Sequence, residues 1–139
     1  MSNAITNLQT AFQCAIAIRP KVGGFPYLAE TLHRAGVTRN FWQLPSCQSL
    51  YLTEQGAVVT QGEPLISGTA DVALFNQNDL ILALRTDQAG NSTFREFLEA
   101  SWKAGVVSYD VDLVARTCTY FGARGEKYVE EYAAVTLEP

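Results

Sequence analysis

The chain has 139 residues, 47% of them hydrophobic, and a formal net charge of -4 from 10 basic and 14 acidic residues. This length fits one compact domain over residues 1–139. The acidic balance argues against a nucleic-acid partner, because phosphate backbones are bound by clustered lysine and arginine.

Three cysteines, Cys14, Cys47 and Cys118, are odd in number and widely spaced, which favours reduced structural thiols over disulfides or a metal knuckle. No window approaches the ~18 apolar residues that span a bilayer, and the N-terminal stretch lacks the early basic residues of a signal peptide. We therefore expect a cytoplasmic protein with no membrane partner, no cofactor and no metal.

In the first half of the chain, helical spacing of apolar residues predicts an amphipathic helix over about residues 3–18. A second helix should begin at Pro26 and end at Gly36, with His33 on its apolar stripe. Three strands should follow, over residues 37–44, 48–53 and 57–61, and residues 62–69 form the best linker candidate.

In the second half, a helix should start at either Val72 or Asn78 and end at Gln88. Thr93 and Glu96 have the spacing of a capping box at the start of another helix, which Gly105 should end. Strands are expected over residues 106–113, 116–121 and 126–132, and the charges of the last strand suit an exposed sheet edge.

The two halves resemble each other when the chain is shifted by 69 residues. Ala35-Gly36-Val37 then aligns with Ala104-Gly105-Val106, and Tyr51 aligns with Tyr120. Residues 25–60 show eight identities, where random pairing gives roughly two. We predict an α+β fold made of a tandem pseudo-repeat, in units of about 1–69 and 70–138. Each unit is a helix-helix-three-stranded antiparallel meander with its helices packed on one face of the sheet. Two similar units of independent origin are the alternative. The meanders could form one sheet or two.

Several residues could carry chemistry. His33 is the only histidine, which favours a packed, hydrogen-bonded imidazole over a general base or a nucleophile pair with Cys47. Asp110 and Asp112 lie two apart on a strand and share a face, where they could bind a hard cation or act as acid and base. A solvated face, or a pair neutralised by arginine, is the alternative.

Aromatic residues suggest a second kind of site. Arg39, Trp42, Tyr51 and Tyr120 could line a groove between the two units that binds a planar or anionic ligand. Packing at an edge strand or at a protein interface would use the same residues. The sequence contains no phosphate-binding glycine loop, nucleophile elbow or zinc motif.

The second half also resembles a known family. The motifs "TFREF" and "AGV", the aspartates at 110 and 112, the strand around Tyr120 and the glycine turn before an acidic end are similar to the YbcV-like family of unknown function. Members of that family are often labelled phage envelope protein. The resemblance implies no mechanism and no catalytic residues.

Three functions follow as hypotheses. The favoured one is a non-enzymatic interaction or structural module, with a homodimer or another protein as partner, because no catalytic set is assembled. The first alternative is a small-molecule-binding protein with a groove between the repeat units. The second alternative is a carboxylate- or metal-dependent enzyme that uses Asp110 and Asp112.

Overall fold

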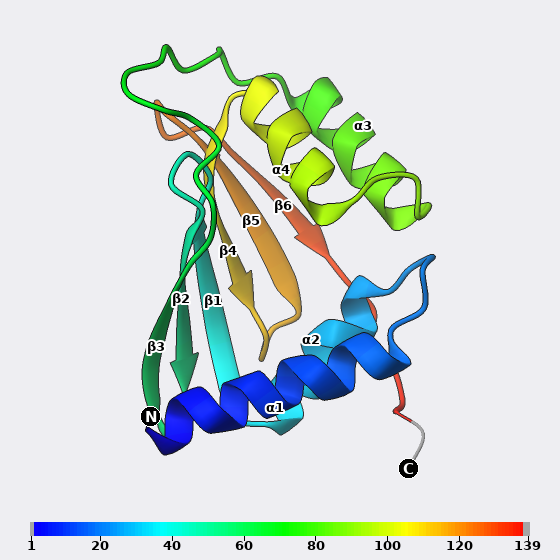
Figure 1. The fold of residues 1–139 in the computed structure, drawn as a ribbon. Coiled ribbons are helices and arrows are strands. Elements are labelled where there is room, and N and C mark those ends of the chain that lie inside the picture. The colour runs from blue at the N-terminus through cyan, green and yellow to red at the C-terminus, as the bar shows by residue number, and fades with distance from the viewer. Residues whose placement is uncertain (1, 138–139) are drawn as a thin grey trace.

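The computed structural model describes residues 2–137, which form four helices and one six-stranded antiparallel sheet (Figure 1). The helices are α1 (Asn3–Ile18), α2 (Phe25–Arg34), α3 (Gln77–Gln88) and α4 (Phe94–Lys103). The strands are β1 (Val37–Gln43), β2 (Gln48–Thr53), β3 (Gly56–Gln61), β4 (Val106–Asp112), β5 (Thr117–Gly122) and β6 (Lys127–Glu131). Chain ends 1 and 139, and the predicted repeat boundary at 138, lie outside the described residues.

The sheet order is β3-β2-β1-β4-β5-β6, so each half of the chain supplies one half of the sheet. Strands β1 and β4 pair antiparallel in the middle, with Phe41 opposite Asp110. The two meanders therefore form one sheet, a point that the sequence leaves open. Because β6 is an outer strand, the expectation that the last strand lies at an edge is confirmed.

The two units repeat each other closely. A shift of 69 residues carries the bounds of α2, β1 and β2 onto those of α4, β4 and β5 without a residue of difference. The turns repeat as well, because Cys47 and Arg116 both have a positive φ, at 53° and 58°. The predicted tandem pseudo-repeat is confirmed as a structural repeat.

All four helices cover the same face of the sheet. Tyr51, Tyr109 and Tyr120 point toward the helices and are buried, while Val59 and Val129 on the other face are 58% and 50% exposed. Helix α1 packs against α2, and α3 packs against α4. Since α2 leads into β1, α4 leads into β4, and these strands are antiparallel, the two helix pairs lie toward opposite ends of the sheet (Figure 1).

The core lies between the helices and the inner sheet face. The first helix pair contributes small and aliphatic side chains, and the second contributes larger ones: Ala4, Leu8, Ala11, Ala15, Ala29 and Leu32 against Leu80, Ala83, Leu84, Phe97 and Leu98. The alanines of α1 let it approach its neighbours closely. Within the described residues, no helix has the length and apolar character needed to cross a membrane.

The connection between the units is longer than predicted. Irregular chain runs over residues 62–76, and α3 starts at Gln77, so the start at Val72 is wrong and the start at Asn78 is right to within one residue. The Asn76 side chain caps α3 by accepting a hydrogen bond from the Asp79 amide at 3.0 Å. The Asn76 amide in turn donates to the Ala104 carbonyl at 2.8 Å, which holds the segment in an extended conformation.

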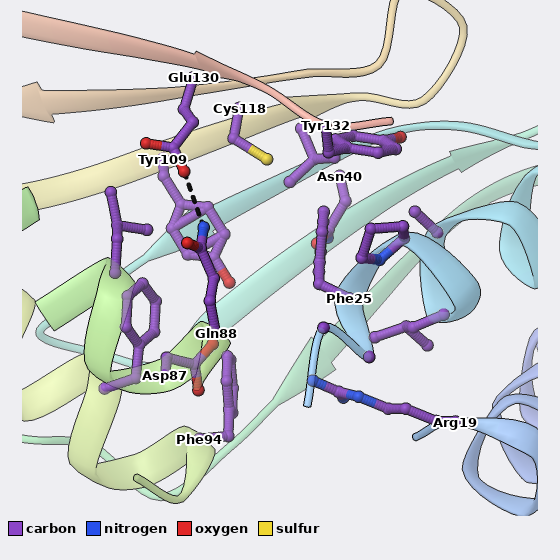
Figure 2. Close-up of a pocket in the computed structure, with 18 of the residues that line it drawn as sticks. Arg19, Phe25, Asn40, Asp87, Gln88, Phe94, Tyr109, Cys118, Glu130 and Tyr132 are labelled. Carbon is purple, nitrogen blue, oxygen red and sulfur yellow. Dashed lines mark hydrogen bonds between the residues drawn. The ribbon is translucent and has the colours of Figure 1, made fainter. Parts of the chain in front are cut away.

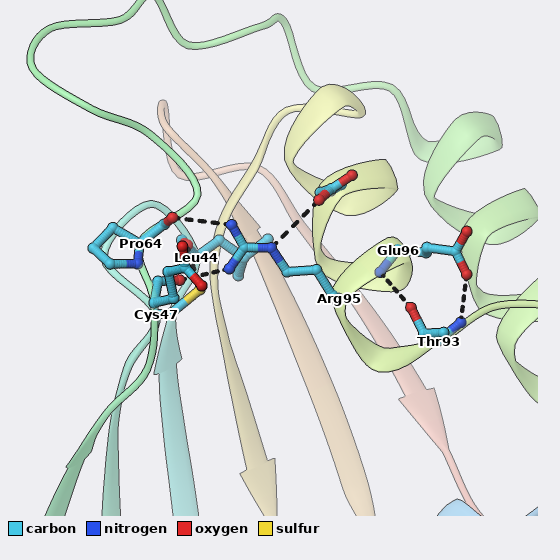
Figure 3. Close-up of polar contacts among 8 residues, drawn as sticks. Leu44, Cys47, Pro64, Thr93, Arg95 and Glu96 are labelled. Atoms are coloured by element: carbon cyan, nitrogen blue, oxygen red, sulfur yellow. Dashed lines mark hydrogen bonds and ion pairs between the residues drawn. The ribbon is translucent and has the colours of Figure 1, made fainter.

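Helix α4 begins with the predicted capping box, and its first turn holds the connection in place (Figure 3). The Glu96 amide donates to Thr93 Oγ1 at 3.1 Å, and the Thr93 amide donates to Glu96 Oε1 at 2.8 Å. Arg95 then donates to the carbonyls of Glu63 and Pro64, at 2.6 and 3.0 Å. One helical turn therefore ties the connection to the second unit.

The expectation that His33 is a packed, hydrogen-bonded imidazole is wrong. Its side chain is 44% exposed, and Nδ1 lies 3.9 Å from Oε2 of Glu30. The buried positions of α2 are Ala29 and Leu32. His33 therefore lies at the edge of the apolar face of the helix and is exposed to solvent.

Candidate functional site

A cavity of about 740 Å³ lies between the two helix pairs and the inner face of the sheet (Figure 2). We call it the central cavity. Residues of both repeat units line it, and its floor is formed by side chains of four neighbouring strands: Asn40, Trp42, Tyr51, Tyr109, Val111, Cys118 and Tyr120. It exists because the helix pairs cover opposite ends of the sheet and leave its middle uncovered.

Aromatic rings form much of the cavity wall. The Trp42 ring stacks on Tyr109, with centroids 6.0 Å apart and planes 16° apart, and meets Phe94 edge-on at 5.1 Å. Phe25 meets Tyr132 edge-on at 5.1 Å. Phe25 and Phe94 occupy equivalent positions, each as the first residue of its helix. Such walls favour a flat guest, because rings stack or meet edge to face.

The polar groups of the floor are uncharged. Asn40 Nδ2 donates to Ser49 Oγ at 2.8 Å and to the Leu50 carbonyl at 3.1 Å. Burial raises the pKa of Tyr109 and of Tyr120 well above the ordinary phenol value, so both hydroxyls stay protonated at physiological pH. The floor thus offers hydrogen bonds without charge.

The thiol of Cys118 belongs to this floor and is kept in its protonated form. Burial raises its pKa to about 12, which keeps it protonated. Cys47 is also buried, whereas Cys14 is exposed. Nucleophilic chemistry needs a thiolate, so Cys118 serves here as an apolar wall residue.

A carboxylate network closes one side of the cavity. Glu130 of the edge strand β6 accepts hydrogen bonds from Arg85 and Gln88 of α3, both at 2.7 Å, and from Tyr128 Oη at 2.9 Å. Burial alone would raise the pKa of Glu130, but these hydrogen bonds outweigh it and lower the pKa below its ordinary value. The network fixes the end of α3 to the sheet (Figure 2).

The two helix pairs touch beside the cavity. The Gly23 amide, in the loop between α1 and α2, donates to the Gln88 carbonyl at the end of α3 at 3.0 Å. Burial raises the pKa of Asp87, while the positive charge of Arg19 and a hydrogen bond from Ser92 oppose that rise. Opposite charges from the two units therefore lie near each other where the helix pairs meet.

The structure brings together three of the six residues predicted to bind a ligand. Trp42, Tyr51 and Tyr120 line the central cavity. The other three lie on the outer face of the sheet, where Arg39 is ion-paired with Asp110. Asp112 accepts hydrogen bonds from the amides of residues 114 and 115, at 3.1 and 2.9 Å, and so stabilises the turn after β4. The six therefore do not form one site.

Both aspartates have partners within the fold, but only Asp110 is paired with an arginine, whereas Asp112 is held by backbone amides. Arg39 also lies over the Phe41 ring, 5.1 Å from its centroid, and its pKa is raised by its hydrogen bond to Asp110. Among the described residues, no group of three or more His, Cys, Asp or Glu side chains is arranged to hold a metal ion.

Sequence reasoning missed Asn40, Tyr109 and the rim residues Asp87 and Glu130. Alternation along β1 gives a usable signal, because Asn40 and Trp42 are two apart and so share a face. A polar residue between hydrophobic neighbours on that face indicates either a hydrogen-bonded core amide or a binding group. The approach of α3 to β6 has no such local signal, since residues 88 and 130 are distant in sequence.

Comparison with known proteins gives a family. A model described as a protein of unknown function, DUF1398, matches residues 17–131, from within α1 to the last residue of β6. The uncharacterised protein Mb2035 of Mycobacterium bovis is 58% identical to this chain over 135 residues, which are 97% of this chain and 82% of the relative. The uncharacterised protein Rv2012 of Mycobacterium tuberculosis matches to the same extent. The family match spans both repeat units and the whole sheet, so this chain belongs to the DUF1398 family of proteins of unknown function.

Proposed function

We propose that the protein binds a small molecule in the central cavity. The observation that carries the proposal is the cavity itself, about 740 Å³ between the two repeat units. Ligand sites usually measure about 300–1,000 Å³ and combine apolar or aromatic walls with a few polar groups. The ring pairs of Trp42 and the uncharged groups of Asn40 and Tyr109 supply this combination.

The two tryptophans allow a direct test. Trp42 lies in the cavity wall, whereas Trp102 is in α4 and is not among the lining residues. Protein labelled with 5-fluorotryptophan gives one 19F resonance for each, and a Trp102→Phe variant assigns them. Naphthalene, a flat apolar probe, should shift the Trp42 resonance in a saturable way and leave that of Trp102 in place.

A pair of variants provides the control. Val111→Phe adds a ring to the cavity floor and should weaken naphthalene binding, because the added ring fills volume that naphthalene would otherwise occupy. Val59→Phe adds the same ring to the outer sheet face and should leave binding unchanged. If neither naphthalene nor any member of a metabolite panel moves the Trp42 resonance, the small-molecule function is wrong.

A protein-interaction module is the second candidate, and the outer sheet face favours it. That face carries the apolar side chains of Phe41, Leu50, Leu52 and Val59, and Val59 is 58% exposed. Exposed apolar patches often mark protein interfaces. Light scattering over a range of concentrations tests its simplest form, a homodimer, and a mass equal to one chain throughout would exclude self-association.

Three expectations stay predictions beside these proposals. They are the resemblance to the YbcV-like family with its phage label, the cytoplasmic location inferred from the cysteines, and the origin of the repeat by duplication. The enzyme hypothesis based on Asp110 and Asp112 has less support, because both carboxylates have partners within the fold.

A further inference from the structure

Two equivalent positions of the repeat lie side by side on the cavity floor. Asn40 of β1 and Tyr109 of β4 are 69 residues apart, 7% and 9% exposed, and both line the central cavity. Trp42 is paired with Tyr109 in the sheet register, so Asn40 is a diagonal neighbour of Tyr109 on the same face. Figure 2 shows both side chains extending from neighbouring strands into this cavity.

The carboxamide of Asn40 offers an acceptor. Nδ2 donates one hydrogen bond to Ser49 Oγ at 2.8 Å and one to the Leu50 carbonyl at 3.1 Å, so both N–H groups are used. The Leu50 carbonyl can only accept, which fixes the amide orientation. Oδ1 is left without a donor among the described residues, on a side chain that is more than nine-tenths buried.

The phenol of Tyr109 offers a donor. Its hydroxyl makes no hydrogen bond with any described residue, although its side chain is nine-tenths buried and reaches the cavity. Such a hydroxyl can give a proton to a carbonyl and keep its own oxygen neutral. Among the described residues, Ser101 Oγ is the only fully buried side-chain polar atom without a partner, so Asn40 Oδ1 and the Tyr109 hydroxyl keep some accessible surface. A guest that pairs with both groups makes hydrogen bonds that an apolar guest of equal size cannot make.

The floor residues themselves are uncharged, and Glu130 of β6 lies opposite the floor residue Cys118 in the sheet register. The charged side chains that line the cavity come from α3, β6 and the loop after α1, and Arg85 and Glu130 are paired with each other. Burying an unpaired charge against Asn40 and Tyr109 would be strongly unfavourable. The inner end of a ligand should therefore be uncharged, and the ring walls require it to be flat.

We propose that the central cavity binds a flat, uncharged heterocycle with a ring amide, whose N–H donates to Asn40 Oδ1 and whose carbonyl accepts from Tyr109 Oη. This inference rests on the proposed small-molecule function and names its ligand class. The ring amide fits because it presents a donor and an acceptor side by side in the plane of an aromatic system. Phe25 and Phe94 flank the space that the rest of the ring would occupy.

Three probes test the proposal on the unaltered sequence, labelled with 5-fluorotryptophan. Quinazolin-4-one carries the ring amide, 3-methylquinazolin-4-one has its N–H blocked, and naphthalene has neither group. We expect the parent quinazolinone to shift the Trp42 resonance with an affinity about tenfold higher than that of its methylated form.

Two conservative variants assign the hydroxyl. Tyr109→Phe removes only Oη and should weaken quinazolinone binding about tenfold while leaving naphthalene binding unchanged. Tyr27→Phe removes a phenol hydroxyl from α2 that is not among the lining residues, and it should leave quinazolinone binding unchanged. Equal losses in both variants would overturn the role given to Tyr109.

The remaining outcomes separate this inference from the proposed function. If naphthalene shifts Trp42 and the two quinazolinones bind equally well, the cavity is a binding site but the ring-amide assignment is wrong. If no probe shifts Trp42, including the wider panel, both proposals fail.

Discussion

Gly36 and Gly105 follow the last turns of α2 and α4, and both have a positive φ, at 98° and 88°. Their surroundings differ. A Cβ at position 36 would meet nothing closer than 3.4 Å, from the Glu54 side chain. A Cβ at position 105 would lie 2.6 Å from the Leu74 carbonyl oxygen and from the Phe75 Cα, which belong to the connection between the units. The same residue therefore has one role in the first unit and two in the second.

Alanine at these two positions should separate the two roles. Gly36→Ala should lower the free energy of unfolding by about 1–2 kcal/mol, the cost of a left-handed conformation for a residue with a side chain. Gly105→Ala should cost roughly 1–3 kcal/mol more, because backbone atoms must also move. Urea unfolding measures both. Equal losses in the free energy of unfolding would show that the close approach of residues 74 and 75 does not restrict position 105.

At the scale of single residues, local chemistry was predictable from the sequence and distant partners were not. The capping box of Thr93 and Glu96 depends on residues three apart, so its spacing alone indicates it. The hydrogen bonds of Asn40 depend on the pairing of β1 with β2, which no local pattern states. Arg39 and Trp42 are three apart on one strand and so face opposite ways, a period-two argument that already divides the predicted site.

Strand β6 is an edge strand that helix α3 secures through one carboxylate. Glu130 points to the inner face and accepts three hydrogen bonds, two of them from α3. Its pKa is lowered from the ordinary value of 4.5. A carboxyl with a lowered pKa in the folded state stabilises the fold above the pKa of the unfolded chain, and this stabilisation is lost as the pH falls through the folded value.

Glu130→Gln should therefore reduce stability at pH 7 by about 1–2 kcal/mol, and the loss should be smaller at pH 3.5, because the stabilisation by the carboxylate declines once the pH falls below the pKa of the unfolded chain. Urea unfolding at both pH values gives the comparison. Glu131→Gln removes the same charge at the next position, where the side chain is exposed, and serves as the control. A Glu130→Gln loss that is the same at both pH values would contradict the role of the ionised carboxylate.

At the scale of elements, the spacing of apolar residues and the glycines that end helices were sufficient to predict the helices and strands. The exception is the start of α3. Val72 and Leu74 are apolar and extend the helical pattern of α3 toward its N-terminus, yet residues 70–76 have no regular secondary structure. The amide of Asn76 pairs with the Ala104 carbonyl, and the backbone at Leu74 lies against Gly105. Contacts with another element decide the conformation here, so propensity alone fails.

The molecule as a whole has one sheet through both units and a single buried cluster beneath the helices. The pairing of β1 with β4 is as continuous as the pairings within each unit, from Arg39 with Asp112 to Gln43 with Ser108. Neither unit can unfold without exposing the inner edge of the other. Cooperative unfolding of the whole chain follows from this continuity.

Each unit contains one tryptophan, Trp42 in the first and Trp102 in the second, so unfolding can be followed separately in both. With 5-fluorotryptophan, the two native 19F resonances should lose intensity with the same urea midpoint. Two separate midpoints would mean that the units unfold independently, despite the shared sheet. Far-UV circular dichroism on the same samples provides the reference transition.

The groove between the units could be predicted from the repeat, and Trp42, Tyr51 and Tyr120 were among the residues expected to line it. Its position over the middle of the sheet could not, because the sequence leaves open whether the meanders join. The depth of the cavity depends on where the helix pairs lie along antiparallel strands. That arrangement is a property of the assembled sheet and has no counterpart in local pattern.

The presence of Asn40 and Tyr109 at equivalent positions of the two units has a consequence for the orientation of a bound molecule. A cavity formed by two identical units would bind an asymmetric molecule in two poses that are related by a half-turn and have equal free energy. A homodimer of one unit cannot escape this degeneracy, since it places the same side chain at both positions. Joining the units in one chain allows each position to differ, and an amide at one position with a phenol at the other distinguishes the two poses. Because the two units are covalently linked, the cavity can favour one orientation of a bound asymmetric molecule.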